Sequence, residues 1–199
     1  MYTQEDAKKA KDRYITLLQS TKRDNINMLI AFLEKNDFFE APSSCKYHSA
    51  FKYGLLFHSL SVYDQLEMLC TLYDKDHSIK DDTRKITALL HDICKTGFYK
   101  LEMRNKKING AWQEVPTYVI DDNFPAGHGE KSVMIAQQFI KLSMQEILAI
   151  NWHMGGFDIR CMDFQGKSAL SNAMEKYQLV TLLHMSDIAS TYLLETRDD

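Results

Sequence analysis

The stretch Leu89-Leu90-His91-Asp92-Ile93-Cys94-Lys95 carries the most concentrated chemistry of the chain. An apolar run delivers a histidine and an aspartate side by side, and a lysine follows about one helical turn later. Imidazole suits divalent transition metals, and a carboxylate can hold one cation or bridge two. Because Asp92 and Lys95 stand three residues apart, a helix would place them on one face, beside the same substrate. A buried helix with an internally satisfied polar pair is an equally open interpretation of this short motif alone.

Length and composition predict an ordinary globular chain. Its 199 residues are enough to bury a substantial core, and hydrophobic residues make up 45% of them. The net charge of −3 gives no overall field that would attract nucleic acid or an anionic membrane. The four cysteines show no close pairing, the first residues are too charged for a signal peptide, and no apolar run is long enough for a membrane span. We therefore expect a cytoplasmic protein with reduced thiols.

Apolar residues at helical spacing predict an all-α chain. The capping box formed by Ser143 and Glu146 marks one helix start. The expected helices lie within residues 4–37 and at 54–73, from 81 or 82 to 95, from 127 to 140, from 143 into 151–156, and from 169 to 194.

One segment departs from the helical pattern. Residues 98–108 and 111–120 alternate like strands, and Asn109-Gly110 between them is a strong signal for a two-residue hairpin turn. The hairpin is basic. Such a hairpin is usually only a solvent-exposed face, and the more specific interpretation is a flap over the substrate. Its positive residues are Lys100, Arg104, Lys106 and Lys107.

Residues able to bind metal recur along the helical segments. Any one of these histidines alone would more often be a hydrogen-bonded core residue. However, each candidate is separated from the next by one helix and its connection. Antiparallel helices can therefore each direct one such residue toward a common centre. Four imidazoles and two carboxylates suit two adjacent transition-metal ions that share one aspartate. The set is His58, His91, Asp92, His128, His153 and Asp187.

This ordered set resembles the HD-domain superfamily of metal-dependent phosphohydrolases. That pattern has a first histidine, a His-Asp doublet, two further histidines in dinuclear members, and a closing aspartate. Cys94 stands where the family often has a glycine before its lysine. The matching segments are residues 54–62 for the first ligand, 89–95 for the doublet, 127–130 and 152–153 for the optional histidines, and 183–187 for the last aspartate.

The resemblance implies a single HD-type domain over residues 1–199, with a helical cover at 1–40, an HD core at 46–195 and a small inserted β-hairpin. It implies two divalent ions (Fe, Mn, Ni, Co or Zn, with Mg as a further option) on the six residues, and Asp92 as the bridge. Asp92 and Lys95 would be catalytic, and His48, Lys52 and Lys95 would contact the substrate. The expected reaction is hydrolysis of a phosphoester on a nucleotide or short oligonucleotide by a metal-activated water.

Several alternatives stay open. The segment from His48 to His58 is most similar to bacterial HD 3′-to-5′ exoribonucleases, but Tyr53 and Phe57 depart from that group and the chain has no room for its OB-like module. A Gly-Tyr-Pro signature of cyclic-di-GMP phosphodiesterases is absent. A di-iron oxygenase of the same superfamily and a non-catalytic metal- or nucleotide-binding module would both keep these ligands. With few basic residues to contact phosphates, stable binding of a long nucleic acid is not expected.

Overall fold

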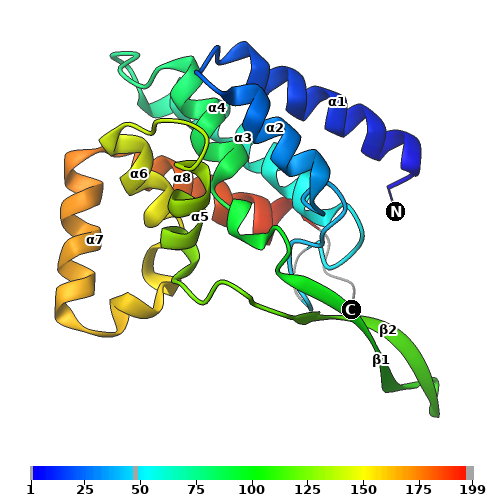
Figure 1. Ribbon diagram of the computed structural model, residues 1–199. Helices are drawn as coiled ribbons and strands as arrows, with labels where there is room; N and C mark the ends of the chain where they lie inside the picture. Colours follow the sequence, from blue (N-terminus) through cyan, green and yellow to red (C-terminus); the bar gives the residue numbers. More distant parts are fainter. Residues whose placement is uncertain (1, 47–48, 196–199) are drawn as a thin grey trace.

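The computed structural model describes residues 2–46 and 49–195. Within these residues the chain forms eight α-helices and one two-stranded antiparallel hairpin (Figure 1), so the expected all-α class with a single hairpin is confirmed. None of the helices in the described ranges combines the length and the apolar character that crossing a membrane requires. The four cysteines are all free thiols.

Two N-terminal helices cover one side of the bundle. α1 (Gln4–Ser20) begins at a Thr3 capping box, and α2 (Ile26–Lys35) follows after a short turn. α1 buries Tyr14 completely, and the Tyr14 hydroxyl donates a hydrogen bond of 2.6 Å to the carbonyl oxygen of Leu89. This bond attaches the cover directly to the segment that carries the His-Asp doublet.

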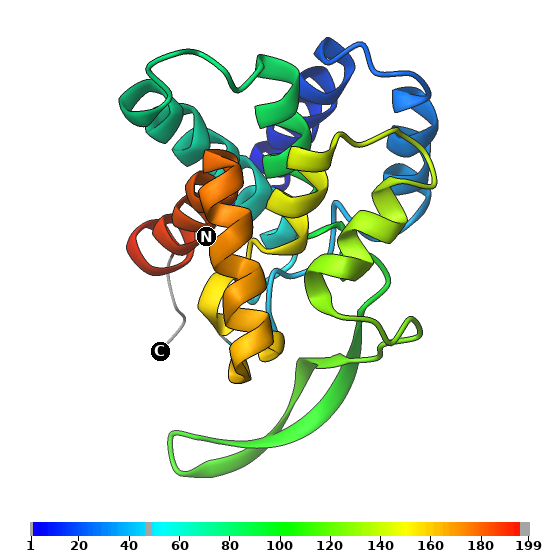
Figure 2. The same cartoon turned by 90° about the vertical axis from the view of Figure 1, so that its left-hand side faces the viewer.

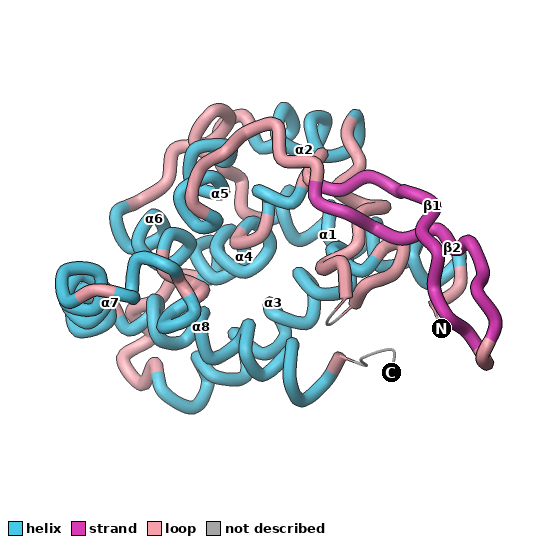
Figure 3. Tube along the Cα trace, turned by 90° about the horizontal axis from the view of Figure 1, so that it is seen from below, coloured by secondary structure: helices cyan, strands magenta, loops and turns pink. Residues whose placement is uncertain are grey.

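The centre of the bundle is built from three helices. α3 (Gly54–Tyr73) packs against both α4 (Asp81–Leu90) and α8 (Gln178–Ala189), as the view from below shows (Figure 3). α3 is apolar around much of its circumference, which is typical of a helix covered by neighbours on several sides. Its bounds agree with the range expected from the sequence.

The expectation that the α4 helix continues to Lys95 is wrong. α4 ends at Leu90, and a separate 3-10 turn covers Ile93–Lys95. Between them Asp92 adopts φ −107° and ψ 17°, in the sparsely populated bridge region where many active-site residues lie. The chain then turns at Gly97, whose φ of +64° favours glycine. The doublet therefore lies at a helix end, where a side chain can leave the helical surface.

The hairpin has the predicted turn, and its strands match the expected ranges except that the first begins one residue later than expected. β1 (Tyr99–Ile108) pairs with β2 (Ala111–Ile120), and Ile108 lies opposite Ala111. The two turn residues, Asn109 and Gly110, both have positive φ, as a type I′ turn requires. The hairpin projects away from the helices (Figures 1 and 2).

The remaining helices close the bundle around the centre. α5 (His128–Ala136) is shorter than expected, and α6 (Met144–Asn151) starts at the predicted capping box of Ser143 and Glu146. α5 packs against α6, and α6 packs against α4 and α8. Two short 3-10 turns, Gly155–Phe157 and Ile159–Met162, then lead to the last pair of helices.

A single final helix over 169–194 is also a wrong expectation. α7 (Phe164–Lys176) starts earlier, where Asp163 caps it, and it ends at Tyr177, whose extended backbone (φ −138°, ψ 109°) separates it from α8. A π-helical turn, Ser190–Leu194, prolongs α8. The break lets α7 turn outward to the edge of the bundle, while α8 runs through its centre (Figure 1).

Candidate metal centre

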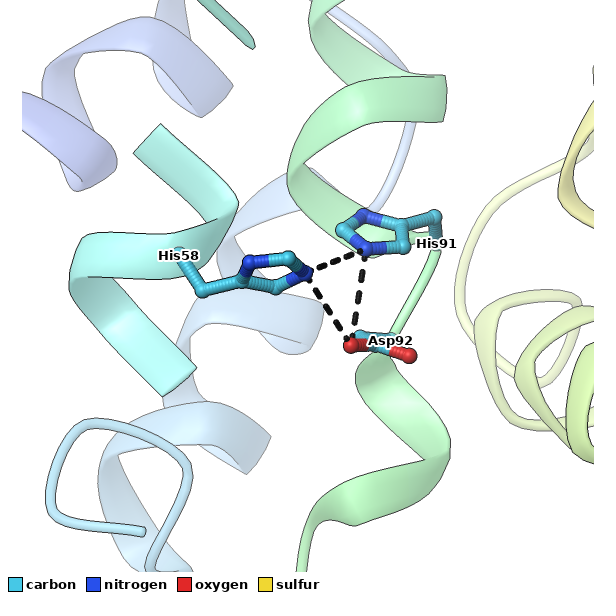
Figure 4. A group of neighbouring side chains, drawn as sticks. All are labelled: His58, His91 and Asp92. Carbon is cyan, nitrogen blue, oxygen red and sulfur yellow. Dashed lines mark hydrogen bonds and ion pairs between the residues drawn. The ribbon is translucent and has the colours of Figure 1, made fainter. Parts of the chain in front are cut away.

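Five parts of the fold bring the six predicted ligand residues to one place. α3 contributes His58, and the end of α4 contributes His91 and then Asp92 (Figure 4). The remaining three come from the first residue of α5, the turn after α6, and α8: His128, His153 and Asp187. We call these six residues the His-Asp cluster.

Asp92 lies at the middle of the His-Asp cluster. Its Oδ2 atom is 3.5 Å from His58 Nε2 and 3.4 Å from His91 Nε2. Its Oδ1 atom is 2.7 Å from His128 Nε2 and 3.5 Å from His153 Nε2. Each carboxylate oxygen therefore faces its own pair of imidazoles, which is the arrangement a bridging carboxylate needs.

Asp187 completes the side of the cluster that contains Oδ2. Its Oδ1 atom is 3.3 Å from His58 Nε2, and the Nε2 atoms of His58 and His91 are 3.2 Å apart. Among the described residues, three overlapping groups could each hold a metal ion, because the ligand atoms within each group lie within 4.8 Å of one another. The groups are His58-His91-Asp92, His91-His153-Asp187 and Asp92-Cys94-His128.

Backbone carbonyls fix the orientation of two imidazoles. His91 Nδ1 is 2.8 Å from the carbonyl oxygen of Ala88, and His153 Nδ1 is 2.7 Å from that of Ile150. Because a carbonyl oxygen only accepts, Nδ1 must carry the proton in both rings. In the neutral ring Nε2 then has a free lone pair directed at the centre, as metal ligation requires.

The buried Nε2 atom of His153 indicates that this donor set fits a metal ion. Its ring is completely buried, and Nε2 has no hydrogen-bond partner among the residues that the structure describes. A buried polar atom without a partner costs free energy, so it calls for an explanation. A cation between His153 and Asp92 would supply one, and the imidazole and carboxylate donors suit divalent transition metals.

The cluster is buried and strongly coupled by charge. Burial opposes ionisation of Asp92, but the charge of Lys95 and its histidine neighbours hold its pKa well below the ordinary value. Burial likewise opposes the charged form of His58, yet Glu195 and Asp187 raise its pKa to about 10. Burial lowers the pKa of His128. A carboxylate that stays ionised amid imidazoles is a ready cation site.

Lys95 contacts the bridging carboxylate directly. Its Nζ atom is 2.5 Å from Asp92 Oδ2, and the side chain is largely buried. Burial alone would favour the neutral amine, but Asp92 raises the pKa of Lys95 above its usual value. The 3-10 turn thus achieves the pairing that the sequence predicted from an α-helix. Lys95 remains a fixed cation at the edge of the cluster.

A cavity of about 340 Å³ opens beside the cluster. Asp92, Lys95, His128 and Asp187 line its floor, so a bound molecule would meet both carboxylates and the lysine. The other lining residues are Ser43, Ser44, Tyr99, Met154, Phe157, His184, Ile188, Thr191 and Tyr192.

Lys95 is the one predicted substrate residue that lines this cavity in the part of the chain that the structure describes. His48 lies outside the described residues. Lys52 is exposed, pairs with Glu40 at 3.4 Å and borders a different pocket beside Tyr118, so its role in phosphate binding stays a prediction. His184, by contrast, lines the cavity and donates from Nδ1 to the carbonyl oxygen of His153 at 2.7 Å.

Three residues at the site were not predicted from the sequence. Glu195 lies 2.6 Å from His58 Nδ1, although 137 residues separate them. Cys94 has its sulfur 3.4 Å from His128 Nδ1, and burial raises the pKa of its thiol to about 12. Tyr99, at the base of the hairpin, lines the cavity. Only Cys94 carried a sequence signal, as the replacement for the glycine in the doublet motif.

No protein-family model, curated protein or solved structure matches this chain. What is established is a mostly helical fold with buried His/Asp groups that can hold metal.

Proposed function

We propose that this chain is a metal-dependent phosphohydrolase of the HD type, which hydrolyses a phosphoester of a nucleotide or short oligonucleotide. The observation that carries the proposal is Asp92, whose two oxygens each face a separate pair of imidazoles while Lys95 contacts the same carboxylate. That arrangement supports two divalent transition-metal ions with Asp92 between them.

The donor set divides naturally into two sides. His58, His91 and Asp187 would hold one ion, and His128 and His153 the other, with Asp92 shared. Metal ions in such a site neutralise charge on phosphate oxygens and lower the pKa of bound water from 15.7 to about 7.

Lys95 would bind the substrate phosphate. Its raised pKa keeps the ammonium protonated at neutral pH, so it acts as a donor and a positive charge and not as a base. It lines the cavity together with Asp92, which places its charge beside the carboxylate of the proposed centre. A positive group fixed in this way stabilises negative charge that develops on the phosphate during hydrolysis.

The cavity supports a small substrate. Its volume of about 340 Å³ lies at the lower end of the range of about 300–1,000 Å³ for small-molecule sites. The aromatic side chains of Tyr99, Phe157 and Tyr192 line its wall, and such surfaces suit the flat face of a base.

The charges of the hairpin also favour a short substrate over a long one. Lys100 lies within 3.6 Å of carboxylates of Glu102 and Asp121, and Arg104 also pairs with Glu102. These neighbouring acids reduce the positive field that a long polyanion would need.

A phosphoester screen tests the proposal. The metal-free protein is loaded separately with Mn²⁺, Fe²⁺, Co²⁺, Ni²⁺, Zn²⁺ and Mg²⁺ and assayed on mononucleotides, cyclic nucleotides, dinucleotides and a chromogenic phosphodiester, with Asp92→Asn as the matched control. We expect metal-dependent release of product that Asp92→Asn abolishes. Product formation that needs Fe²⁺ and dioxygen instead would favour the oxygenase alternative, and binding of nucleotide without turnover would favour a non-catalytic module.

A further inference from the structure

Glu195 contacts His58, one of the proposed metal ligands, but has no role in the proposed function. Its Oε1 atom is 2.6 Å from His58 Nδ1, and its Oε2 atom is 2.6 Å from the Ser49 hydroxyl. The His58 ring is completely buried, and the Glu195 side chain is only 10% exposed. Both carboxylate oxygens therefore have defined partners in a nearly dry environment.

The hydrogen-bond partner of Nδ1 distinguishes His58 from His91 and His153. His91 and His153 donate from Nδ1 to carbonyl oxygens three residues earlier on their own helical segments. The corresponding carbonyl in α3 is that of Leu55, which accepts a hydrogen bond of 2.8 Å from Ser59. The Nδ1 position of His58 is held instead by a carboxylate from the far end of the chain.

The same C-terminal segment approaches His58 at both ring nitrogens. Asp187, on α8, lies 3.3 Å from Nε2, and Glu195, just after the π-helical turn, lies 2.6 Å from Nδ1. The Ser49 hydroxyl donates to the second oxygen of Glu195 and so fixes the direction of the carboxylate. A proton on Nδ1 that is donated to Glu195 leaves Nε2, once that nitrogen is deprotonated on binding a cation, with its lone pair facing Asp92 and Asp187.

We propose that Glu195 is a positioning residue of the metal centre: it fixes the tautomer and ring orientation of His58, increases the basicity of Nε2, and so strengthens binding of the ion on the His58 side. A carboxylate behind a ligating imidazole has these effects in metal sites generally, and loss of such a partner typically costs about 10- to 100-fold in metal affinity. The inference rests on the proposed metal centre and adds a residue to it.

Titration of the metal-free protein with Zn²⁺ in competition with a chromogenic chelator tests this role without any activity assay. The variants are Glu195→Gln, Glu195→Ala, Ser49→Ala and His58→Ala, and Glu175→Gln on the exposed surface of α7 is the matched charge control. We expect one of two Zn²⁺ sites to weaken by about 10- to 100-fold in Glu195→Ala. Gln keeps an acceptor oxygen, so Glu195→Gln should weaken it less, and Ser49→Ala less again, while Glu175→Gln should match the wild type.

A second readout follows the imidazole itself. In the Zn²⁺-loaded wild type, long-range ¹H–¹⁵N NMR spectra should show His58 with its proton on Nδ1, and Glu195→Ala should broaden or shift these signals more than those of His91. Circular dichroism and thermal unfolding check that each variant keeps its fold. If Glu195→Ala fails to fold, the Zn²⁺ affinities of Glu195→Gln and Ser49→Ala decide the question.

The outcomes separate the two proposals. If His58→Ala loses a Zn²⁺ site while folded Glu195 variants bind both ions as the wild type does, the positioning role is wrong and the metal centre stands. If the wild type binds no Zn²⁺, the metal centre fails and the role of Glu195 fails with it.

Discussion

At the scale of single residues, the enclosure of Asp92 determines what the site can do. The residue is 2% exposed, and its neighbours are cationic or titratable: Lys95 at 2.5 Å and four imidazoles within 3.5 Å. A lone buried carboxylate would cost several kcal/mol, so its partners must compensate. Because the charge of Lys95 and the neighbouring histidines hold the pKa of Asp92 well below its ordinary value despite burial, Asp92 is a carboxylate at neutral pH.

Replacing Asp92 by asparagine should remove the metal and the reaction together. The amide has nearly the same shape but carries no charge and cannot hold two cations, so we expect loss of both ions and of detectable turnover. Elemental analysis of the purified protein and the phosphoester assay measure the two effects. An Asp92→Asn variant with normal metal content and full activity would show that the doublet is structural.

Replacing Lys95 by methionine should separate binding of metal from chemistry. Met keeps the apolar length of the side chain but removes the charge proposed to contact the phosphate, so we expect metal content to persist while turnover falls about 10²- to 10³-fold. The measured quantities are metal stoichiometry and kcat at saturating metal.

The matched control for that variant is Lys85→Met. Like Lys95, Lys85 is largely buried. It lies on α4 and donates hydrogen bonds to Asp81 and Ser20, which do not line the cavity. Its loss should lower stability and leave kcat unchanged. Equal losses of kcat in both variants would mean that Lys95 has no role of its own in the reaction.

At the scale of secondary-structure elements, Asp74 connects the end of α3 to the start of α8. Its carboxylate accepts hydrogen bonds from the backbone N–H groups of Ser78 and Ile79 and from the Gln178 side chain, at 2.9–3.0 Å. Burial raises the pKa of Asp74, but these donors outweigh it and lower the pKa below the ordinary 3.8. The connection matters to the site, because α3 carries His58 and α8 carries Asp187.

Asp74→Ala should therefore destabilise the fold by about 1.5–3 kcal/mol, the usual contribution of hydrogen bonds to a charged group. Since the folded-state pKa lies below the unfolded one, this stabilisation is fully present above about pH 4 and is lost as the pH falls through the folded value. Urea unfolding of both proteins at pH 7 and at decreasing pH measures the difference. A difference that grows on acidification would contradict the assignment.

Local signals in the sequence were sufficient for some elements and insufficient for others. The Asn109-Gly110 turn and the Ser143–Glu146 capping box were predictable because each depends on residues adjacent in the chain. The early end of α4 at Leu90 and the break at Tyr177 were not, because apolar spacing continues through both points.

The candidate ligands could be predicted as a set because they lie on, or at the ends of, helical segments that the apolar spacing marks. Their convergence is a property of the structure, which places Asp92 between two pairs of imidazoles. Glu195 was not predictable, since a single glutamate near the end of the chain carries no pattern and reaches His58 only through the π-helical turn after α8. Side chains that orient a ligand leave no spacing signal.

At the scale of the whole molecule, the acidic balance and the small cavity predict a preference for short substrates. We expect the protein to hydrolyse a dinucleotide faster than a long single strand at moderate salt, because few unpaired positive groups surround the cavity to release counterions. Comparing the rates of product release per enzyme on the two substrates tests this.

The hairpin supplies the control for substrate length. A variant with Lys100, Arg104, Lys106 and Lys107 all changed to glutamine should act on the dinucleotide as the wild type does. Faster, processive digestion of the long strand by the wild type, lost in this variant, would contradict the short-substrate account and favour the exonuclease alternative.

Anomalous X-ray diffraction from crystals of the Mn²⁺-loaded protein, recorded on both sides of the manganese absorption edge, would locate bound ions at the His-Asp cluster directly. For a dinuclear centre we expect two anomalous peaks about 3.5–4 Å apart, on either side of Asp92. One should lie beside His58, His91 and Asp187, and the other beside His128 and His153. A single peak would contradict the dinuclear centre. No peak at the His-Asp cluster, with Mn²⁺ present in the crystal, would contradict the metal centre itself.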